Sequence, residues 1–299
     1  MLVIWNPNAG SVRNAARIKS ELTRNRDVEL AETNSSDEAI ELVCRQIGQG
    51  ERRIVAAGGD GTVNAVINGM MRESSDAELA VLPLGTANDW CASLGIPDDL
   101  WQAKSLIDGW NARPLDIIEL ESPHVHKYFA NIATGGNSQR VTESITPEMK
   151  RKWGALCYLR GAIGIVPNLQ TYHASISFDD GPAEEFNVWN IIVANGQTSA
   201  GRLMVAPKAK LDDGLLDIVI IRDGTVLDLA EMTVQFLTSQ SYVALEQVEY
   251  RQAKTITLTS EPPLLFSIDG DLVEEQPSRF RVKPKAINVV VGPKFPSAF

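Results

Sequence analysis

Residues 54–64 constrain the fold most, because an apolar run leads directly into a glycine-rich turn. The short apolar run at 54–57 is typical of a strand buried in a sheet. Gly58, Gly59 and Gly61 then let the backbone turn sharply and approach a ligand without interference from Cβ atoms. A helix that begins here would point its free N–H groups and the positive end of its dipole at an anion. We therefore expect a phosphate site at this turn, with an unliganded strand-to-helix turn as the alternative.

Two polar residues of the turn refine this expectation. Thr62 would add a hydroxyl donor for a phosphate. Asp60 is unusual, because an acid beside phosphates is repelled unless it holds a cation, a ribose hydroxyl or a backbone turn. We therefore expect Asp60 to act through magnesium or through water.

Strand-like and helix-like segments alternate through the first part of the chain. The predicted strands are 2–6, 28–32, 53–57, 78–82 and 113–120, and the predicted helices are 15–22, about 35–47 and 63–71, with helical patterns continuing to about 107. Ser35 and Glu38 have the spacing of a capping box at the second helix. Such alternation predicts an α/β fold with a mainly parallel, doubly wound sheet. The loops at 6–10 and 82–90 would then lie at the carboxyl ends of strands, where open α/β sheets bind ligands.

The pattern changes after residue 121, where strand-like segments separated by turn residues predominate. They are 128–134, 171–178, 186–194, 215–222, 255–258, 264–268, 280–282 and 287–291, with helical inserts near 147–166 and 227–237. This pattern predicts an antiparallel second domain, a sandwich or irregular barrel. We expect an α/β nucleotide-binding domain over 1–121 and a β-sandwich-like domain over 122–299, with the last segment free to pack back on the first domain.

Composition narrows the class of protein. The net charge of −10 disfavours a nucleic-acid-binding role and broad attraction to anionic lipid. No run of 18 uncharged apolar residues occurs, and the first residues lack the pattern of a signal peptide, so we expect a cytoplasmic protein. Cys44, Cys91 and Cys157 are widely spaced among apolar neighbours, which predicts buried reduced thiols. The histidines lack ligand spacing and are expected at the surface or in structural roles; they are His124, His126 and His173.

Five motifs, taken in chain order, resemble the diacylglycerol kinase catalytic-domain family, in particular the bacterial soluble lipid kinases of the YegS type. The motifs are Asn6-Pro7 with Gly10, Gly58-Gly59-Asp60-Gly61-Thr62 with Asn64, the segment 83–89, the segment 212–217 and Ile268-Asp269-Gly270-Asp271. Sphingosine and ceramide kinases are more distant relatives. The glycine loop is shared with NAD kinases and, in related form, with phosphofructokinases. The segments 83–89 and 212–217 therefore give the resemblance its specificity.

The resemblance implies an active site between the two domains and transfer of the γ-phosphoryl group of ATP to a lipid hydroxyl. The residues it implies for ATP binding are Asn6, Thr33, Gly58, Gly59, Asp60, Gly61, Thr62, Asn64 and Thr86. Asp213, with the backbone carbonyls of Lys210 and Leu215, would hold a structural Mg²⁺. Asp60, Asp89 and Asp116 match the family's acidic network, and Asp271 stands where the family has the glutamate that accepts the hydroxyl proton.

Elementary chemistry agrees with these assignments. Phosphoryl transfer needs positioning, a metal ion that neutralises the phosphates and a base on the attacking hydroxyl. Asp212, Asp213 and Asp217 suit a hard cation with oxygen ligands, and the alternative is an acidic surface turn. Asp269 and Asp271 are two residues apart and can share a face of a strand. Asp271 is expected to be the base, with Asp269 or Asp116 as the next candidate and Glu274 and Glu275 on a solvated face.

The partners follow from the same resemblance. We expect a glycerolipid substrate, such as diacylglycerol or phosphatidylglycerol, which the protein reaches by peripheral contact with the membrane surface. We expect no nucleic-acid partner, and a homodimer is left open. A basic and apolar segment suits docking at a membrane surface, although an ordinary packed helix is the alternative; it comprises Lys150, Arg151, Lys152, Trp153, Tyr158, Leu159, Ile163 and Ile165. The rival functions are an NAD kinase and a nucleotide-binding regulatory protein without turnover, the latter because of Asp271 in place of glutamate.

Overall fold

The computed structural model describes most of the chain. The described residues are 1–9, 14–73, 76–137, 169–199, 201, 203–225, 228, 246–269, 271–273, 275–277 and 279–295. The predicted insert at 147–166, the docking segment within it and nearly all of the insert at 227–237 lie outside these residues.

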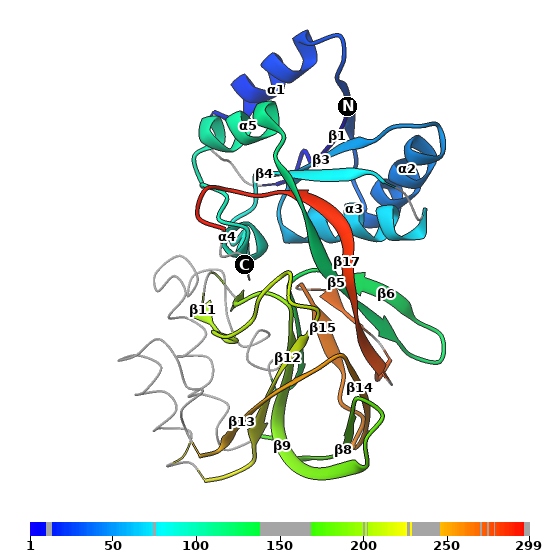
Figure 1. The fold of residues 1–299 in the computed structure, drawn as a ribbon, viewed down its shortest axis with the longest axis vertical. Coiled ribbons are helices and arrows are strands. Elements are labelled where there is room, and N and C mark those ends of the chain that lie inside the picture. The colour runs from blue at the N-terminus through cyan, green and yellow to red at the C-terminus, as the bar shows by residue number, and fades with distance from the viewer. Residues whose placement is uncertain are drawn as a thin grey trace.

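The N-terminal domain is a parallel sheet covered by helices on both faces (Figure 1). Its strands run in the order β2-β1-β3-β4 and all pair in parallel; their bounds are β1 (Leu2–Trp5), β2 (Glu29–Glu32), β3 (Arg53–Gly58) and β4 (Glu78–Pro83). The helices are α1 (Ala15–Arg24), α2 (Ser36–Gly48), α3 (Asp60–Arg72), α4 (Asp89–Ser93) and α5 (Leu100–Gly109). Helices α2 and α3 lie on one side of the sheet, and α1 and α5 lie on the other. The predicted α/β, doubly wound architecture is confirmed.

The starts of α2 and α3 show how the sequence sets the helices. Ser35 caps α2 by accepting a hydrogen bond from the Glu38 N–H, and the Glu38 carboxylate accepts one from the Asn34 N–H, so the predicted cap is confirmed. Helix α3 begins at Asp60, three residues before the predicted start. The reason is that the Gly59 carbonyl already accepts hydrogen bonds from the N–H groups of the next helical turn. The glycine turn is therefore the first turn of the helix itself.

The second domain consists of antiparallel strands, as predicted (Figure 1). The strands are β6 (His126–Phe129), β7 (Ile132–Gly136), β8 (Tyr172–Phe178), β9 (Ala183–Ala194), β12 (Leu216–Arg222), β13 (Val248–Ala253), β14 (Thr255–Glu261), β15 (Phe266–Ile268) and β16 (Asp271–Leu272), with the short pair β10 (Thr198–Ser199) and β11 (Leu203–Met204) apart from the main sheet. The prediction of one strand over 128–134 was wrong, since β6 and β7 are separate. Strand β13 was missed, because its sequence is polar at most positions.

Two long strands join the domains. Strand β5 (Ala112–Glu121) pairs antiparallel with β17 (Arg279–Val290), which also pairs with β14 in the second domain and, in parallel, with β4 in the first. The two strands predicted at 280–282 and 287–291 are thus one strand, with a register shift after Lys283. Ile117 packs in the core of the first domain and Ile118 in that of the second. Alternate side chains of one strand therefore belong to two different cores.

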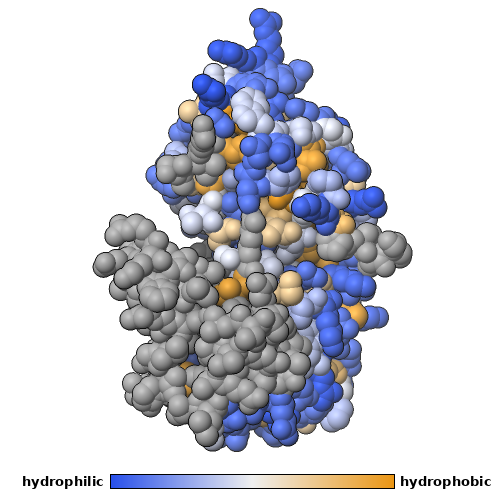
Figure 2. Space-filling view, turned by 90° about the vertical axis from the view of Figure 1, so that its left-hand side faces the viewer, coloured by the Kyte–Doolittle hydropathy of each residue, from blue (hydrophilic) through white to orange (hydrophobic). Residues whose placement is uncertain are grey.

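The described surface is mainly polar. Figure 2 shows hydrophilic side chains over most of the coloured surface on one face, with hydrophobic side chains in small areas. Among the described residues, no helix has the length and apolar character needed to cross a membrane. Cys44 and Cys91 are free thiols, with Cys91 buried and Cys44 half-buried rather than buried. The three histidines are exposed or largely exposed, as predicted.

Candidate active site

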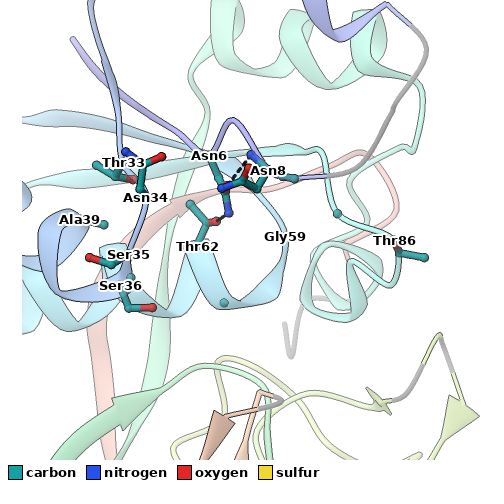
Figure 3. Close-up of a pocket in the computed structure, with 14 residues that line it drawn as sticks. Asn6, Asn8, Thr33, Asn34, Ser35, Ser36, Ala39, Gly59, Thr62 and Thr86 are labelled. Carbon is teal, nitrogen blue, oxygen red and sulfur yellow. Dashed lines mark hydrogen bonds between the residues drawn. The ribbon is translucent and has the colours of Figure 1, made fainter. Parts of the chain in front are cut away.

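A pocket of about 380 Å³ lies at the carboxyl ends of the parallel strands. The strand order changes direction at β1, so the loops after β1 and β3 leave the sheet toward opposite faces and open a crevice between them. Figure 3 shows polar side chains from several loops facing this one space. The pocket is lined by Asn6, Asn8, Ala9, Thr33, Asn34, Ser35, Ser36, Ala39, Gly59, Gly61, Thr62, Ala65, Gly85 and Thr86.

Most of the residues expected to contact a nucleotide come together here. Those that line the pocket are Asn6, Thr33, Gly59, Gly61, Thr62 and Thr86, whereas Gly58, Asp60 and Asn64 do not line it. The Asn6 amide donates a hydrogen bond to the Thr62 hydroxyl at 3.1 Å, which joins the loops after β1 and β3. The lining residues that were not expected are Asn8, Ala9, Asn34, Ser35, Ser36, Ala39, Ala65 and Gly85. Of these, Ser35 has a sequence signal, but the capping box that it forms with Glu38 predicts a helix start and not a pocket.

The pocket offers an anion helix dipoles and N–H donors rather than charged side chains. All of its lining residues are uncharged. The first turns of α2 and α3, two helices of 13 residues, both lie at its wall. Helix N-termini present N–H donors and positive partial charge, which favour an anion such as a phosphate. Gly59, at the N-terminus of α3, has no side chain that could occupy these donors.

Close packing explains the glycines of this site. A Cβ atom on Gly85 would lie 2.5 Å from the Gly59 Cα atom, so the two backbones touch where the loops after β3 and β4 cross. A Cβ atom on Gly58 would lie 2.2 Å from the Thr62 hydroxyl oxygen. Asn88, which has a positive φ of 49°, holds the crossing in place by exchanging two hydrogen bonds with the Gly85 backbone. The segment 83–89 is therefore one wall of the pocket.

Asp60 and Asp89 lie beside the glycine turn and connect it to the second domain. The Asp60 carboxylate accepts hydrogen bonds from the N–H groups of Asp89 and Trp90, both at 3.3 Å, and so caps α4. The Asp89 carboxylate accepts one from the Gly201 N–H at 3.1 Å. Burial raises the pKa of Asp60, and the nearby charge of Asp89 adds to the rise. A carboxylate that holds a backbone turn was one of the three expected roles for Asp60.

The turn that leads to Asp271 packs against α3. The Asp269 carboxylate accepts hydrogen bonds from the Ile132 N–H at 3.0 Å and from the Asn64 side-chain amide at 3.2 Å. Burial raises the pKa of Asp269 to about 7, and the charge of Asp60 contributes. Asp271 follows at the start of β16, where its backbone pairs with Ile268; its side chain lies outside the described atoms.

A second group of carboxylates surrounds the loop at 211–215. The buried Asp116 accepts hydrogen bonds from the N–H groups of Gly214 at 2.6 Å and Lys285 at 2.8 Å. The Asp213 carboxylate accepts one from the Leu215 N–H at 3.1 Å. Burial raises the pKa of both Asp116 and Asp213, and Asp212 adds to each rise. The hydrogen bonds of Asp116 thus attach it to this loop, whereas those of Asp60 attach it to α4.

The loop has the donors that a hard cation needs. Carboxylate and backbone carbonyl oxygens are the ligands that Mg²⁺ and Ca²⁺ prefer. Burial is the main cause of the raised pKa of Asp116 and Asp213, and the charge of Asp212 adds to both. A divalent ion held by Asp213 and the carbonyls of Lys210 and Leu215 would relieve this repulsion, so the residues present fit the ion.

A different group of ligand-type side chains occurs on β5 and β6. Within the described residues, Glu119, Glu121 and His126 are the one group of three whose ligand atoms lie within 4.8 Å of one another. Arg281 and Lys283 lie 3.7 and 3.5 Å from the Glu119 carboxylate and lower its pKa together with His126. Positive side chains therefore already compensate Glu119, and this group is an ion-pair cluster.

Comparison with known proteins agrees with this architecture. A family model described as the diacylglycerol kinase catalytic domain matches residues 1–120, and one described as the YegS C-terminal NAD kinase beta sandwich-like domain matches residues 131–291. A Pseudomonas aeruginosa protein named probable lipid kinase YegS-like is 30% identical over 290 residues, which cover 97% of this chain and 93% of the relative. A Bacillus subtilis protein named diacylglycerol kinase is 28% identical over 80% of this chain and 77% of its own length.

A solved structure shares the whole fold. A protein of Bacillus anthracis, described as a candidate diacylglycerol kinase, superposes with a TM-score of 0.82 at 25% identity and covers 99% of this chain and 96% of its own. The chain belongs to the family of YegS-like lipid kinases, which combine a diacylglycerol kinase catalytic domain with an NAD kinase-like β-sandwich domain.

Proposed function

We propose that this protein is an ATP- and Mg²⁺-dependent lipid kinase, which transfers the γ-phosphoryl group of ATP to a hydroxyl of a glycerolipid such as diacylglycerol or phosphatidylglycerol. The observation that carries the proposal is the uncharged pocket at the N-termini of α2 and α3, whose N–H donors suit a phosphorylated ligand. Helix α3 also contacts the hairpin that bears Asp271, through Asn64 and Asp269. The names of the relatives support a lipid as acceptor.

In this proposal the pocket binds ATP. Thr62 and the backbone of Gly59 and Gly61 hold phosphate oxygens, and the loop residues Asn6 and Thr33 hold the rest of the nucleotide. Asp60 and Asp89 fix the wall of the cleft through α4. Because most of the catalysis of phosphoryl transfer comes from positioning and electrostatics, a rigid wall is itself a contribution to rate.

Asp271 is the proposed general base. It accepts the proton of the lipid hydroxyl while the hydroxyl oxygen attacks the γ-phosphorus and ADP leaves with the electron pair of the broken P–O bond. A base in hydrogen-bond reach contributes about 10²–10⁴-fold to the rate. Aspartate is one methylene shorter than the glutamate that the family places here, so the hairpin must lie closer to the acceptor or a water must join the two groups.

A divalent ion would be held by Asp213 and the carbonyls of Lys210 and Leu215, where it would neutralise the acidic loop. The protein works at the surface of a membrane in this proposal, from the cytoplasmic side, because a glycerolipid headgroup is presented there.

The test is to incubate the protein with γ-labelled ATP, Mg²⁺ and a lipid in detergent micelles, and to identify the labelled product. Separate reactions contain diacylglycerol, phosphatidylglycerol or a bacterial lipid extract. A further reaction with NAD in place of lipid tests the alternative function, an NAD kinase. Label in a phosphorylated lipid is the expected result. Label in NADP would show an NAD kinase, and ATP binding without labelled product would show a regulatory protein.

A further inference from the structure

One side-chain hydrogen bond joins the glycine turn to the hairpin that bears Asp271. Its donor is the amide of Asn64, in the second turn of α3, and its acceptor is the carboxylate of Asp269, at 3.2 Å. The two residues lie 205 positions apart in the sequence and belong to different domains. Asn64 does not line the nucleotide pocket, which favours a structural role for this hydrogen bond.

The acceptor side of this bond is rigid. Asp269 directly follows β15, which pairs antiparallel with β16, and it has a positive φ of 47°, as the first residue of a tight hairpin turn requires. The Asp269 N–H donates to the Ile132 carbonyl at 3.1 Å, and the Ile132 N–H donates back to the Asp269 carboxylate. Both the backbone and the side chain of Asp269 are therefore attached to β7.

The donor side is rigid as well. The Asn64 side-chain oxygen accepts a hydrogen bond from the Asn68 amide, one helical turn further along α3. Asn68 in turn donates to the Tyr128 carbonyl at 2.8 Å and accepts from the Tyr128 N–H at 2.9 Å. The orientation of the Asn64 amide is thus determined, since its oxygen faces Asn68 and its nitrogen must face Asp269.

We propose that Asp269 is a positioning residue, which couples the nucleotide-binding turn at the start of α3 to the hairpin of Asp271 through its hydrogen bond with Asn64. The inference rests on the proposed function and deepens it. Asp271 is two residues beyond Asp269 and its backbone pairs with Ile268, so a displacement of Asp269 moves the backbone that bears the proposed base. A misplacement of about 1 Å at a reacting group can reduce the rate about 100-fold.

A carboxylate is required at this position because both of its partners are donors. Asparagine can accept from the Ile132 N–H, but it then turns its own amide N–H₂ toward that of Asn64. Swapping the residues at positions 64 and 269 restores a donor opposite an acceptor. In the double variant Asn64→Asp, Asp269→Asn, the new aspartate accepts from Asn68 and from residue 269, and the asparagine at 269 still accepts from Ile132.

The first experiment is steady-state kinetics with ATP, Mg²⁺ and diacylglycerol micelles at a temperature well below melting. Asp269→Asn should lower kcat at least tenfold and leave KM for ATP within twofold, and the exchange variant should return kcat to within threefold of the parent. A matched control is Asp179→Asn, because Asp179 also has a positive φ and a carboxylate that binds backbone N–H groups, in a turn after β8. An exchange variant no more active than Asp269→Asn, or a control that loses as much activity, would overturn the proposal.

The second experiment needs no lipid and separates this inference from the proposed function. Hydrogen–deuterium exchange is followed in peptides spanning 264–273, with and without a non-hydrolysable ATP analogue. The analogue should slow exchange severalfold in the parent and in the exchange variant, but not in Asn64→Ala. If this holds for a parent that phosphorylates no lipid, the proposed function fails and the coupling stands. If the analogue binds to the parent and leaves this exchange rate unchanged, the coupling is refuted.

Discussion

The two groups of carboxylates in this protein are built differently. Around the glycine turn, Asp60, Asp89 and Asp269 accept hydrogen bonds from elements far away in the sequence, on both sides of the domain boundary. At the loop 211–215, Asp213 binds within its own loop, and Asp116 binds that loop and the bulge of β17. Both groups therefore link the two domains, but the first links them at the glycine turn, whereas the second converges on the loop 211–215. We expect variants of the first group to change chemistry and variants of the second to change metal response and stability.

The largest effect is expected at the hairpin of the first group. Asp271→Asn removes the proposed base and should lower turnover by about 10²–10⁴-fold. ATP affinity should stay nearly unchanged, because the pocket at α2 and α3 is intact; isothermal titration with ATP and a label-transfer assay measure the two quantities. Asp271→Glu should keep or raise turnover. Transfer at the parent rate by Asp271→Asn would move the base to Asp269 or Asp116 and remove the positioning role of Asp269.

A somewhat smaller effect is expected where the two loops of the pocket cross. In Gly85→Ala the new methyl group would overlap the Gly59 backbone, which neither loop can avoid without moving. Overpacking of this kind costs about 1–3 kcal/mol, and we expect ATP affinity to fall at least tenfold and melting temperature to fall by several degrees. Gly61→Ala is the matched control for stability, because a Cβ atom there has no neighbour within 4 Å. Equal melting temperatures for the two variants would show that the crossing is not tight.

For the second group we expect variants to change the effect of Mg²⁺ on stability more than the rate of phosphoryl transfer. Addition of Mg²⁺ should raise the melting temperature of the parent, because an ion that binds the folded state at 100 times its Kd adds about 2.7 kcal/mol to the free energy of unfolding. Asp213→Ala should abolish this rise and reduce activity. The exposed Asp180 provides the control Asp180→Ala, which should respond like the parent. A full Mg²⁺ response in Asp213→Ala would remove the metal site from this loop.

The smallest effect is a change in how stability depends on pH. Asp269 has a folded pKa of about 7, above the ordinary value of an aspartate, so the folded state binds this proton more tightly than the unfolded state. Its ionisation therefore lowers the free energy of unfolding as pH rises from about 4 to about 7. Asp269→Asn lacks this titration, so its stability relative to the parent should increase as pH rises through that range.

Urea midpoints of the two proteins at pH 5 and pH 8 measure this difference. Asp179→Asn is again the comparison, and its stability relative to the parent should change less between the two values of pH. A difference between Asp269→Asn and the parent that stays constant, or that changes in favour of the parent, contradicts a raised pKa at Asp269.

Local signals were sufficient for much of the first domain. The apolar run and glycines at 54–61 predicted β3 and its turn, and Ser35 with Glu38 predicted the start of α2. Such features depend on a few neighbouring residues, which is why sequence shows them. The alternation of strands and helices also placed the loop at 82–90 at the ligand-binding edge of the sheet, and this loop is a wall of the pocket.

The features of the fold and the site that were not predicted depend on contacts between residues far apart in the sequence. Asp60 caps α4, 29 residues away, and Asn64 meets Asp269, 205 residues away, so neither contact has a local pattern. Strand β13 pairs with β12 alone and is polar along much of its length, so its sequence has no clear alternation. Strand β17 was divided in the prediction because the register shift after Lys283 interrupts its pattern.

The most direct test of the central claim compares two labels in one reaction of the parent protein with Mg²⁺ and diacylglycerol micelles. With γ-labelled ATP, we predict label in the phosphorylated lipid in a 1:1 ratio to the ADP released. With α-labelled ATP, we predict that all label stays in the nucleotide. Release of ADP without labelled lipid, or no turnover by a protein that binds ATP, would contradict the claim that this site transfers a phosphoryl group to a lipid.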